Sequence, residues 1–212
     1  NFIVPSGNFG NIFSAYVAKQ MGLPINRLHV ATNQNDILKS ILTHGQMSKK
    51  IVSQTYSPSM DIQISSNFER QMFESFDRDS HQVKNAFDEF HKTGNYLFSP
   101  KVINNFKKIY DASSINDDET LNTISKIFKK YNYISDPHTA TGFKLLMDKN
   151  DDETWVSLAC AHPAKFNTAV EKAIGKATDI PIELSNLFDK KENMTILPNN
   201  IQEVKNYLLQ NI

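Results

Sequence analysis

The sequence has 212 residues, of which 40% are hydrophobic and 22% are charged, and 23 basic side chains balance 23 acidic ones. This is the composition of a globular protein, and without a basic excess it argues against a surface devoted to nucleic acid or to an acidic membrane. The single cysteine, Cys160, excludes a fold held together by internal disulfides.

The first part of the chain predicts alternating strands and helices. Residues 2–4 are a short apolar run, and a helical pattern begins at Asn11 after a loop with two glycines. Residues 27–31 have the pattern of a second strand, and a polar loop then precedes a helix expected to begin near Ile37. This order predicts an α/β fold with an open, mostly parallel sheet and flanking helices.

Residues 66–131 predict a helical lobe. Apolar side chains recur there at helical spacing from Phe68, from Val83 and from Leu121. The acidic residues 117–119 suit the N-terminus of the third of these helices, because its dipole is positive at that end.

The alternating order returns in the last third of the chain. Residues 155–160 give the clearest late strand, a helix is expected over 167–174, and Asn199 or Asn200 can cap a final helix. The predicted organisation is an α/β domain part at 1–65 and 132–180, the helical lobe at 66–131 and a C-terminal helical segment at 181–212.

The loop after the first strand has the features of an anion-binding site. Gly7 and Gly10 permit tight turns, Asn8 and Asn11 carry amide donors, and the first N–H groups of the following helix lack internal partners. Neither a Walker A loop nor the G-x-G-x-x-G fingerprint is present. We therefore expect the phosphate of a small cofactor or substrate here, the alternative being an ordinary tight turn.

Five segments, in order along the chain, carry a family resemblance. They are VPSGNFGN at 4–11, ATNQND at 31–36, SPSMDI with SNFER between 57 and 70, DPHTA at 136–140, and AHPAKF at 161–166. Together they resemble threonine synthase, a pyridoxal-phosphate enzyme of fold type II. The resemblance spans nearly the whole chain.

The resemblance implies a lyase of threonine biosynthesis that converts O-phospho-L-homoserine and water to L-threonine and phosphate. Phosphate leaves from the γ carbon and water adds at the β carbon. The implied cofactor is pyridoxal 5′-phosphate, whose ring acts as an electron sink. Gly7, Asn8, Phe9, Gly10 and Asn11 match the loop around the cofactor phosphate.

The family's Schiff-base lysine lies in a block resembling S/A-F-K-D, which does not occur in this sequence. The resemblance therefore implies the C-terminal part of such an enzyme, with the catalytic lysine upstream and the N-terminal part as its partner. Lys165 and Lys19 do not match the lysine block. We expect the chain alone to be inactive.

Cys160 stands where the family often has threonine, next to the pyridine nitrogen of the cofactor. A thiol is a weaker hydrogen-bond donor than a hydroxyl, so this departure bears on the strength of the contact. Three other interpretations stay open: a buried structural cysteine, a cysteine hydrolase that pairs Cys160 with His162, and a non-catalytic phosphate-binding fragment.

The remaining candidates carry weaker signals. Asn33 and Asp36 follow the second strand, where ligands of open sheets bind, although Asn35 or Asp36 can instead cap the next helix. His138 is expected to be a hydrogen-bonded structural residue. No metal-ligand spacing occurs. No apolar stretch has the length of a membrane span, so we expect a cytoplasmic monomer or homodimer without nucleic-acid or membrane partners.

Overall fold

The computed structural model describes residues 1–187 and 189–211 and divides into two compact units, Asn1–Thr178 and Asp179–Ile212. The first unit contains a sheet of four parallel strands in the order β5-β2-β1-β6. The strands are β1 (Phe2–Pro5), β2 (Leu28–Thr32), β5 (Tyr110–Ser114) and β6 (Val156–Ser157). The predicted α/β class with an open, parallel sheet is confirmed.

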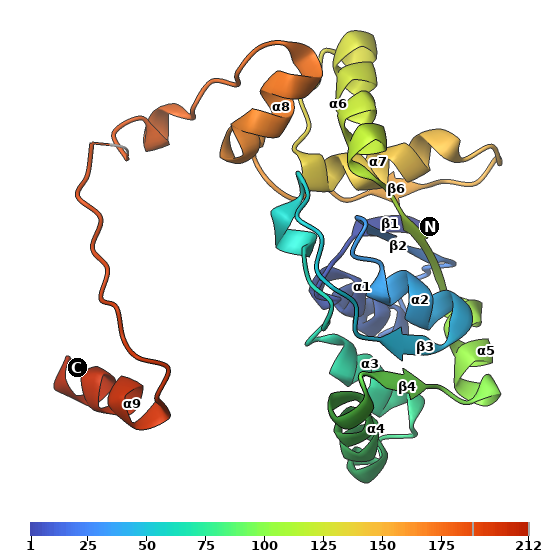
Figure 1. Ribbon diagram of the computed structural model, residues 1–212. Helices are drawn as coiled ribbons and strands as arrows, with labels where there is room; N and C mark the ends of the chain where they lie inside the picture. The colour runs from blue at the N-terminus through green and yellow to red at the C-terminus, as the bar shows by residue number, and fades with distance from the viewer. Residues whose placement is uncertain (188, 212) are drawn as a thin grey trace. The chain divides into compact units, whose positions relative to one another are not determined.

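Helices cover both faces of this sheet (Figure 1). The helices of the unit are α1 (Gly10–Gln20), α2 (Ile37–His44), α3 (Phe68–Ser75), α4 (Ser80–Thr93), α5 (Pro100–Ile109), α6 (Asp117–Tyr131), α7 (Pro137–Asp148) and α8 (Asn167–Ile174). Of these, α1, α2, α5 and α7 make the main contacts with the strands of the sheet. A two-stranded antiparallel ladder of β3 (Gln46–Ser48) and β4 (Asn95–Leu97) and two short 3-10 turns, η1 (Pro58–Met60) and η2 (Pro163–Phe166), complete the unit. The second unit contains η3 (Ile182–Leu184) and α9 (Ile201–Gln210).

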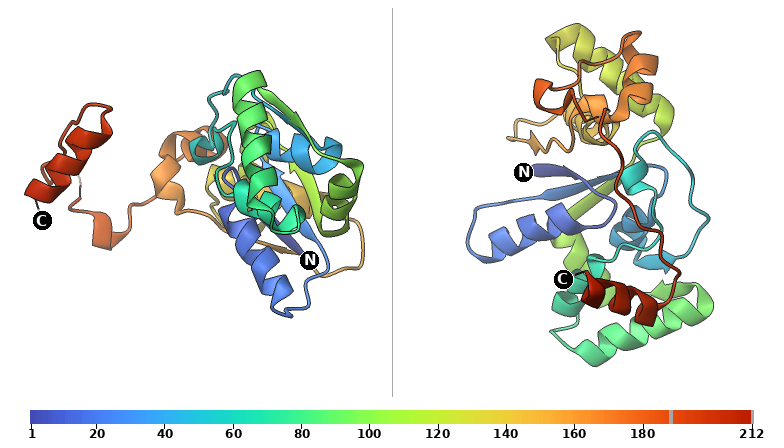
Figure 2. Two further views of the ribbon diagram at one scale, coloured as in Figure 1. Left: turned by 90° about the horizontal axis from the view of Figure 1, so that it is seen from below. Right: turned by 90° about the vertical axis from the view of Figure 1, so that its left-hand side faces the viewer.

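Strands β1 and β2 are buried on both faces, as parallel strands between helical layers must be. Val4 and Val30 pack into the larger core with residues of α1 and α2. Ile3 and Ala31 face the other way and pack with Leu145 of α7. The right-hand view in Figure 2 shows α1, in blue, and α7, in gold, on opposite sides of the strands. The sheet is therefore the rigid layer from which the loop after β1 extends.

Residues 66–131, predicted to be a helical lobe, also contain two strands, β4 in the antiparallel ladder with β3 and β5 in the main sheet. Tyr110–Ser114 pairs along β2 and ends the sheet on that side. Its polar, five-residue sequence has no strand pattern of its own, so the ladder with β2 determines its conformation. Helix α6 then packs on α7 and α8, whereas α3 packs on α4 and α1.

Several predicted helix ends are confirmed. Helix α6 begins at the acidic residues 117–119, Gly175 ends α8, and Asn200 caps α9. The structure adds a reciprocal capping box of Asn116 and Glu119 at the start of α6. The predicted strand at 155–160 is shorter, because only Val156 and Ser157 pair with β1. Within the described residues, every helix is too short or too polar to cross a membrane.

Gly142 lets α7 approach the sheet closely. A Cβ atom there would lie 2.5 Å from Ser157 Oγ and 3.0 Å from Pro5 Cγ. We predict that Gly142→Ala lowers the free energy of unfolding by about 1–2 kcal/mol, although alanine is the better helix former. Chemical denaturation measures the change. Adding Ser157→Ala should recover part of the loss, and a stabilised single variant would contradict the close packing.

Candidate functional site

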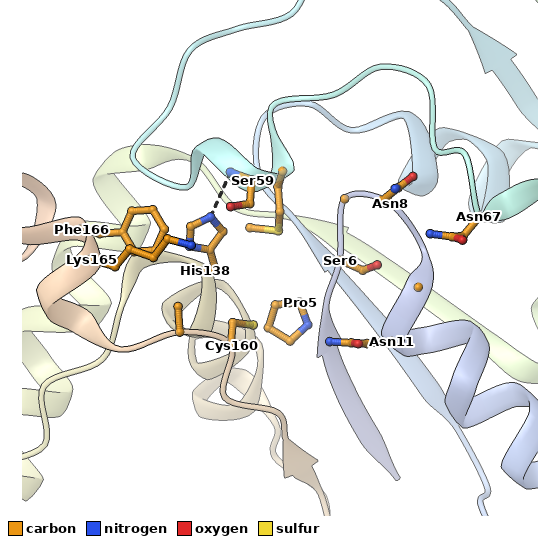
Figure 3. A pocket seen from close by; sticks show the side chains of 14 residues that line it. Pro5, Ser6, Asn8, Asn11, Ser59, Asn67, His138, Cys160, Lys165 and Phe166 are labelled. Carbon is orange, nitrogen blue, oxygen red and sulfur yellow. Dashed lines mark hydrogen bonds between the residues drawn. The ribbon is translucent and has the colours of Figure 1, made fainter. Parts of the chain in front are cut away.

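A cavity of about 340 Å³ lies at the carboxyl end of β1. Its walls come from residues 5–8, 10 and 11 of the loop after β1, from Ser59, Met60 and Asn67, from His138, and from the segments 160–161 and 165–166 (Figure 3). Ligands of open α/β sheets bind beyond the carboxyl ends of the strands, so the fold places the cavity where a site is expected. Of the residues predicted from sequence, the structure brings together Gly7, Asn8, Gly10, Asn11 and Cys160.

Phe9 does not line this cavity. Its side chain is fully buried and makes edge-to-face contacts with Phe68 and Tyr110, at ring-centroid distances of 5.0 and 5.6 Å. Its backbone N–H donates to Ser6 Oγ at 3.1 Å. Phe9 therefore offers neither its side chain nor a free backbone N–H for the predicted contact with the cofactor phosphate. Its ring instead anchors the loop to the core.

The two glycines of the loop act differently from the expectation that they permit tight turns. The left-handed backbone conformation occurs at Phe9, with φ 60°, and not at Gly7 or Gly10. Gly7 is needed for close approach, because its Cβ would lie 2.8 Å from Met60 Cα in η1. At Gly10 a Cβ would meet only Asn67 Nδ2, at 3.5 Å, so this position has room for a side chain or a ligand.

Helix α1 opens with free backbone donors. Its first backbone bond runs from Phe13 N to Phe9 O at 3.1 Å, and within residues 1–187 and 189–211 no acceptor meets the amides of Gly10, Asn11 and Ile12. The first turn has no acidic residue. Free N–H groups and the positive end of the helix dipole together favour an anion, and phosphate above all.

Asn8 ties the loop to the start of α3. Its Oδ1 accepts hydrogen bonds from Ser66 N at 2.6 Å and from Ser66 Oγ at 2.8 Å. Asn67, the N-cap residue of α3, makes no capping bond with its side chain and lines the cavity instead. The amide side chains of Asn8, Asn11 and Asn67 therefore surround the opening of α1 (Figure 3).

Cys160 lies across the cavity from this loop and is held by its backbone, whose N–H donates to Thr139 Oγ1 at 2.8 Å. Cys160 is exposed as a residue and is therefore not a buried structural cysteine. Partial desolvation of its thiol and then the negative charge of Asp136 raise the pKa of the thiol to about 11. The thiol is therefore protonated at neutral pH and can donate a hydrogen bond. His162 accepts from Ala164 N at 3.2 Å and caps η2, so nothing here supports a cysteine hydrolase.

His138 is hydrogen-bonded inside the protein, as expected, and also lines the cavity. Its Nδ1 lies 2.9 Å from Asp136 Oδ1, and its Nε2 accepts from Ser59 N at 3.1 Å. A ring that accepts at Nε2 carries its proton on Nδ1, which assigns the neutral tautomer. Ser59 and Asn67 are cavity residues that the sequence does not single out, although both lie in the resembling segment between 57 and 70.

Asn33 and Asn35 hold the long segment that leads into η1. Their side-chain amides donate to Asp61 Oδ1 at 2.8 and 3.0 Å, and neither residue lines the cavity. The alternative of helix capping is also not observed, since no side chain caps α2 and Asp36 pairs with Lys50 at 2.7 Å. In the described part of the chain, no three His, Cys, Asp or Glu side chains come together as metal ligands.

The matching family profile, the curated relatives and the similar solved structures are all described as threonine synthase. A family profile described as "Threonine synthase, C-terminal" matches residues 139–208. Threonine synthase of Pseudomonas aeruginosa is 38% identical over 99% of this chain and 45% of its own length, and that of Saccharomyces cerevisiae is 36% identical over 96% and 43%. The chain thus spans less than half the length of these relatives.

Two solved structures are similar over nearly the whole chain. PLP-bound threonine synthase from Brucella melitensis has a TM-score of 0.89 and 43% identity, covering 99% of this chain and 45% of that one. Threonine synthase from yeast has a TM-score of 0.85 and 36% identity, with coverages of 99% and 46%.

Proposed function

Since this chain belongs to the threonine synthase family and matches the C-terminal part of its relatives, we propose that it forms the phosphate-binding side of a site for pyridoxal 5′-phosphate. The observation that carries the proposal is the opening of α1, where the free amides of Gly10 and Asn11 face the cavity that Cys160 also lines. The same cofactor is bound in the similar threonine synthase from Brucella melitensis.

The residues present fit this cofactor. Neutral N–H donors, three amide side chains and a first helical turn without acidic residues suit a phosphate dianion. The space beside Gly10 leaves its approach open. Across the cavity, the protonated thiol of Cys160 would donate to the nitrogen of the pyridine ring.

The proposed reaction of the whole protein is the conversion of O-phospho-L-homoserine and water to L-threonine and phosphate. When bound, pyridoxal phosphate supplies an electron sink that stabilises a carbanion next to the ring. This chain's residues would bind the cofactor phosphate and keep a neutral donor at the pyridine side.

We propose that the catalytic lysine belongs to the N-terminal part of the enzyme. Lys19 is bound to the carbonyl oxygen of Ile25, and Lys165 is exposed at the cavity wall outside the family's lysine block. That part is the proposed partner of this chain, and the chain alone should form no threonine. A cytoplasmic location and a monomeric or homodimeric state stay predictions.

The test compares two ligands on the full-length protein that contains this chain. Pyridoxal 5′-phosphate should bind roughly a hundredfold more tightly than pyridoxal, because only the former carries the group that the helix amides would bind. Spectroscopic titration measures both affinities, and release of threonine and phosphate from O-phospho-L-homoserine measures the activity. Equal affinities would reject the phosphate loop, and absence of threonine would reject the reaction.

A further inference from the structure

The carboxylate of Asp136 is the most completely buried charged group near the cavity, with 0% of the residue exposed. It is the N-cap of α7, but it accepts more hydrogen bonds than a cap requires. Its oxygens meet His138 N and Nδ1 at 2.9 Å each, Thr139 N at 3.4 Å, Ala161 N at 3.2 Å, and the hydroxyl of Thr139. One carboxylate thus organises several donors from different segments of the chain.

Two of these bonds determine where Cys160 lies. The ladder with β1 ends where Leu158 N donates to Ile3 O at 3.0 Å. In the described residues, the next hydrogen-bonded backbone donors of this segment are Cys160 N, bound to Thr139 Oγ1, and Ala161 N, bound to Asp136 Oδ2. Where the chain leaves the sheet and reaches the cavity, the side chains of Thr139 and Asp136 therefore replace β1 as the acceptors for its backbone N–H groups.

The same carboxylate also reaches the opposite wall through His138. Asp136 holds the Nδ1 side of the ring, and the Nε2 side accepts from Ser59 N at 3.1 Å (Figure 3). Ser59 belongs to η1, which packs against Gly7 of the loop. A single buried group is thus connected to both the Cys160 wall and the η1 wall.

The charge of Asp136 adds an electrostatic effect. Burial alone raises the pKa of Asp136, but hydrogen bonds from His138, Thr139 and Ala161 outweigh it, and the net pKa lies below the ordinary value. The ionised carboxylate contributes to the raised pKa of the Cys160 thiol, whereas hydrogen bonding to Thr139 lowers it. His138 and Lys165 line the same cavity, and His162 follows Cys160 by two residues.

We propose that Asp136 is a positioning residue of this site, which fixes Cys160 through Thr139 and Ala161 and fixes Ser59 through His138. The inference rests on the proposed function for the identity of the ligand that Cys160 meets. Its structural part concerns only this chain's own residues, so it can be tested without the cofactor.

The test measures the pH dependence of alkylation at Cys160 in cofactor-free, full-length protein, with the modified peptide quantified by mass spectrometry. In the unsubstituted protein the midpoint should lie near the Cys160 pKa of about 11. Asp136→Asn keeps a cap acceptor but removes the charge, so the midpoint should fall. Thr139→Val should change the alkylation profile of Cys160, because Cys160 N loses the acceptor that holds it, and Thr139→Ser should restore the profile.

A second readout connects the network to the proposed reaction. In the loaded enzyme, Asp136→Asn and Thr139→Val should lower kcat by roughly tenfold or more while the affinity for pyridoxal 5′-phosphate changes by less than about threefold. Unchanged alkylation profiles in both variants would overturn the proposal. If Asp136→Asn does not fold, the Thr139 pair decides. An inactive parent protein would reject the proposed function and leave the alkylation result to be judged separately.

Discussion

Gly10→Asp is expected to weaken binding of pyridoxal 5′-phosphate by a hundredfold or more in the full-length protein. The new carboxylate would lie in the cavity beside Asn67 Nδ2, which is 3.5 Å from the position of the Cβ. Two unit charges of like sign about 4 Å apart repel by about 4 kcal/mol at an effective dielectric constant of about 20. A hundredfold loss needs only about 2.8 kcal/mol, so repulsion of the phosphate dianion should decide the outcome.

The same substitution should leave the fold intact or stabilise it. Gly10 is the first residue of α1, whose first turn has no acidic residue, and a carboxylate there stabilises a helix by about 0.3–1 kcal/mol. Loss of affinity with an unchanged or higher melting temperature therefore separates a site effect from unfolding. Gly10→Asn is the control, because asparagine has nearly the same volume without the charge. Equal loss in both variants would show that space, and not the anion, limits binding.

The sequence predicts the layers of this fold well where local patterns carry the information. The apolar runs of β1 and β2, the start of α6 at the acidic residues 117–119, and the cap at Asn200 all occur where the pattern places them. Strand β5 is not predicted, because its residues are polar and only pairing with β2 makes them a strand. Elements formed by long-range pairing leave little trace in local sequence.

For the candidate site, the sequence predicts which segments lie near the cavity better than it predicts where their individual side chains point. Asn8, Gly10 and Cys160 are brought together from distant positions, as the resembling segments imply. Asn33 and Asn35 lie in another such segment but serve a buried network around Asp61. A motif identifies residues that a family shares. Only the packed structure separates the residues that line the cavity from those that support the segments around it.

Phe9 shows this distinction most directly, and we expect Phe9→Ala to lower the free energy of unfolding by about 3–5 kcal/mol. The ring is fully buried between Phe68 and Tyr110, so its removal leaves a cavity that the sheet and α3 cannot readily fill. The backbone at residue 9 is left-handed, with φ 60°, which is a strained conformation for any residue other than glycine. Alanine keeps this backbone strain but loses the ring packing that offsets it. Chemical denaturation of the cofactor-free protein measures the loss.

Phe9→Leu tests whether this residue acts through the core or through the cofactor. Leucine retains most of the buried apolar surface, so the free energy of unfolding should fall by only about 1–2 kcal/mol. Because the Phe9 amide is bound to Ser6 Oγ and its ring faces away from the cavity, the added stability that pyridoxal 5′-phosphate confers should equal that of the unsubstituted protein. A leucine variant of ordinary stability that binds the cofactor poorly would instead place the ring of Phe9 in the site.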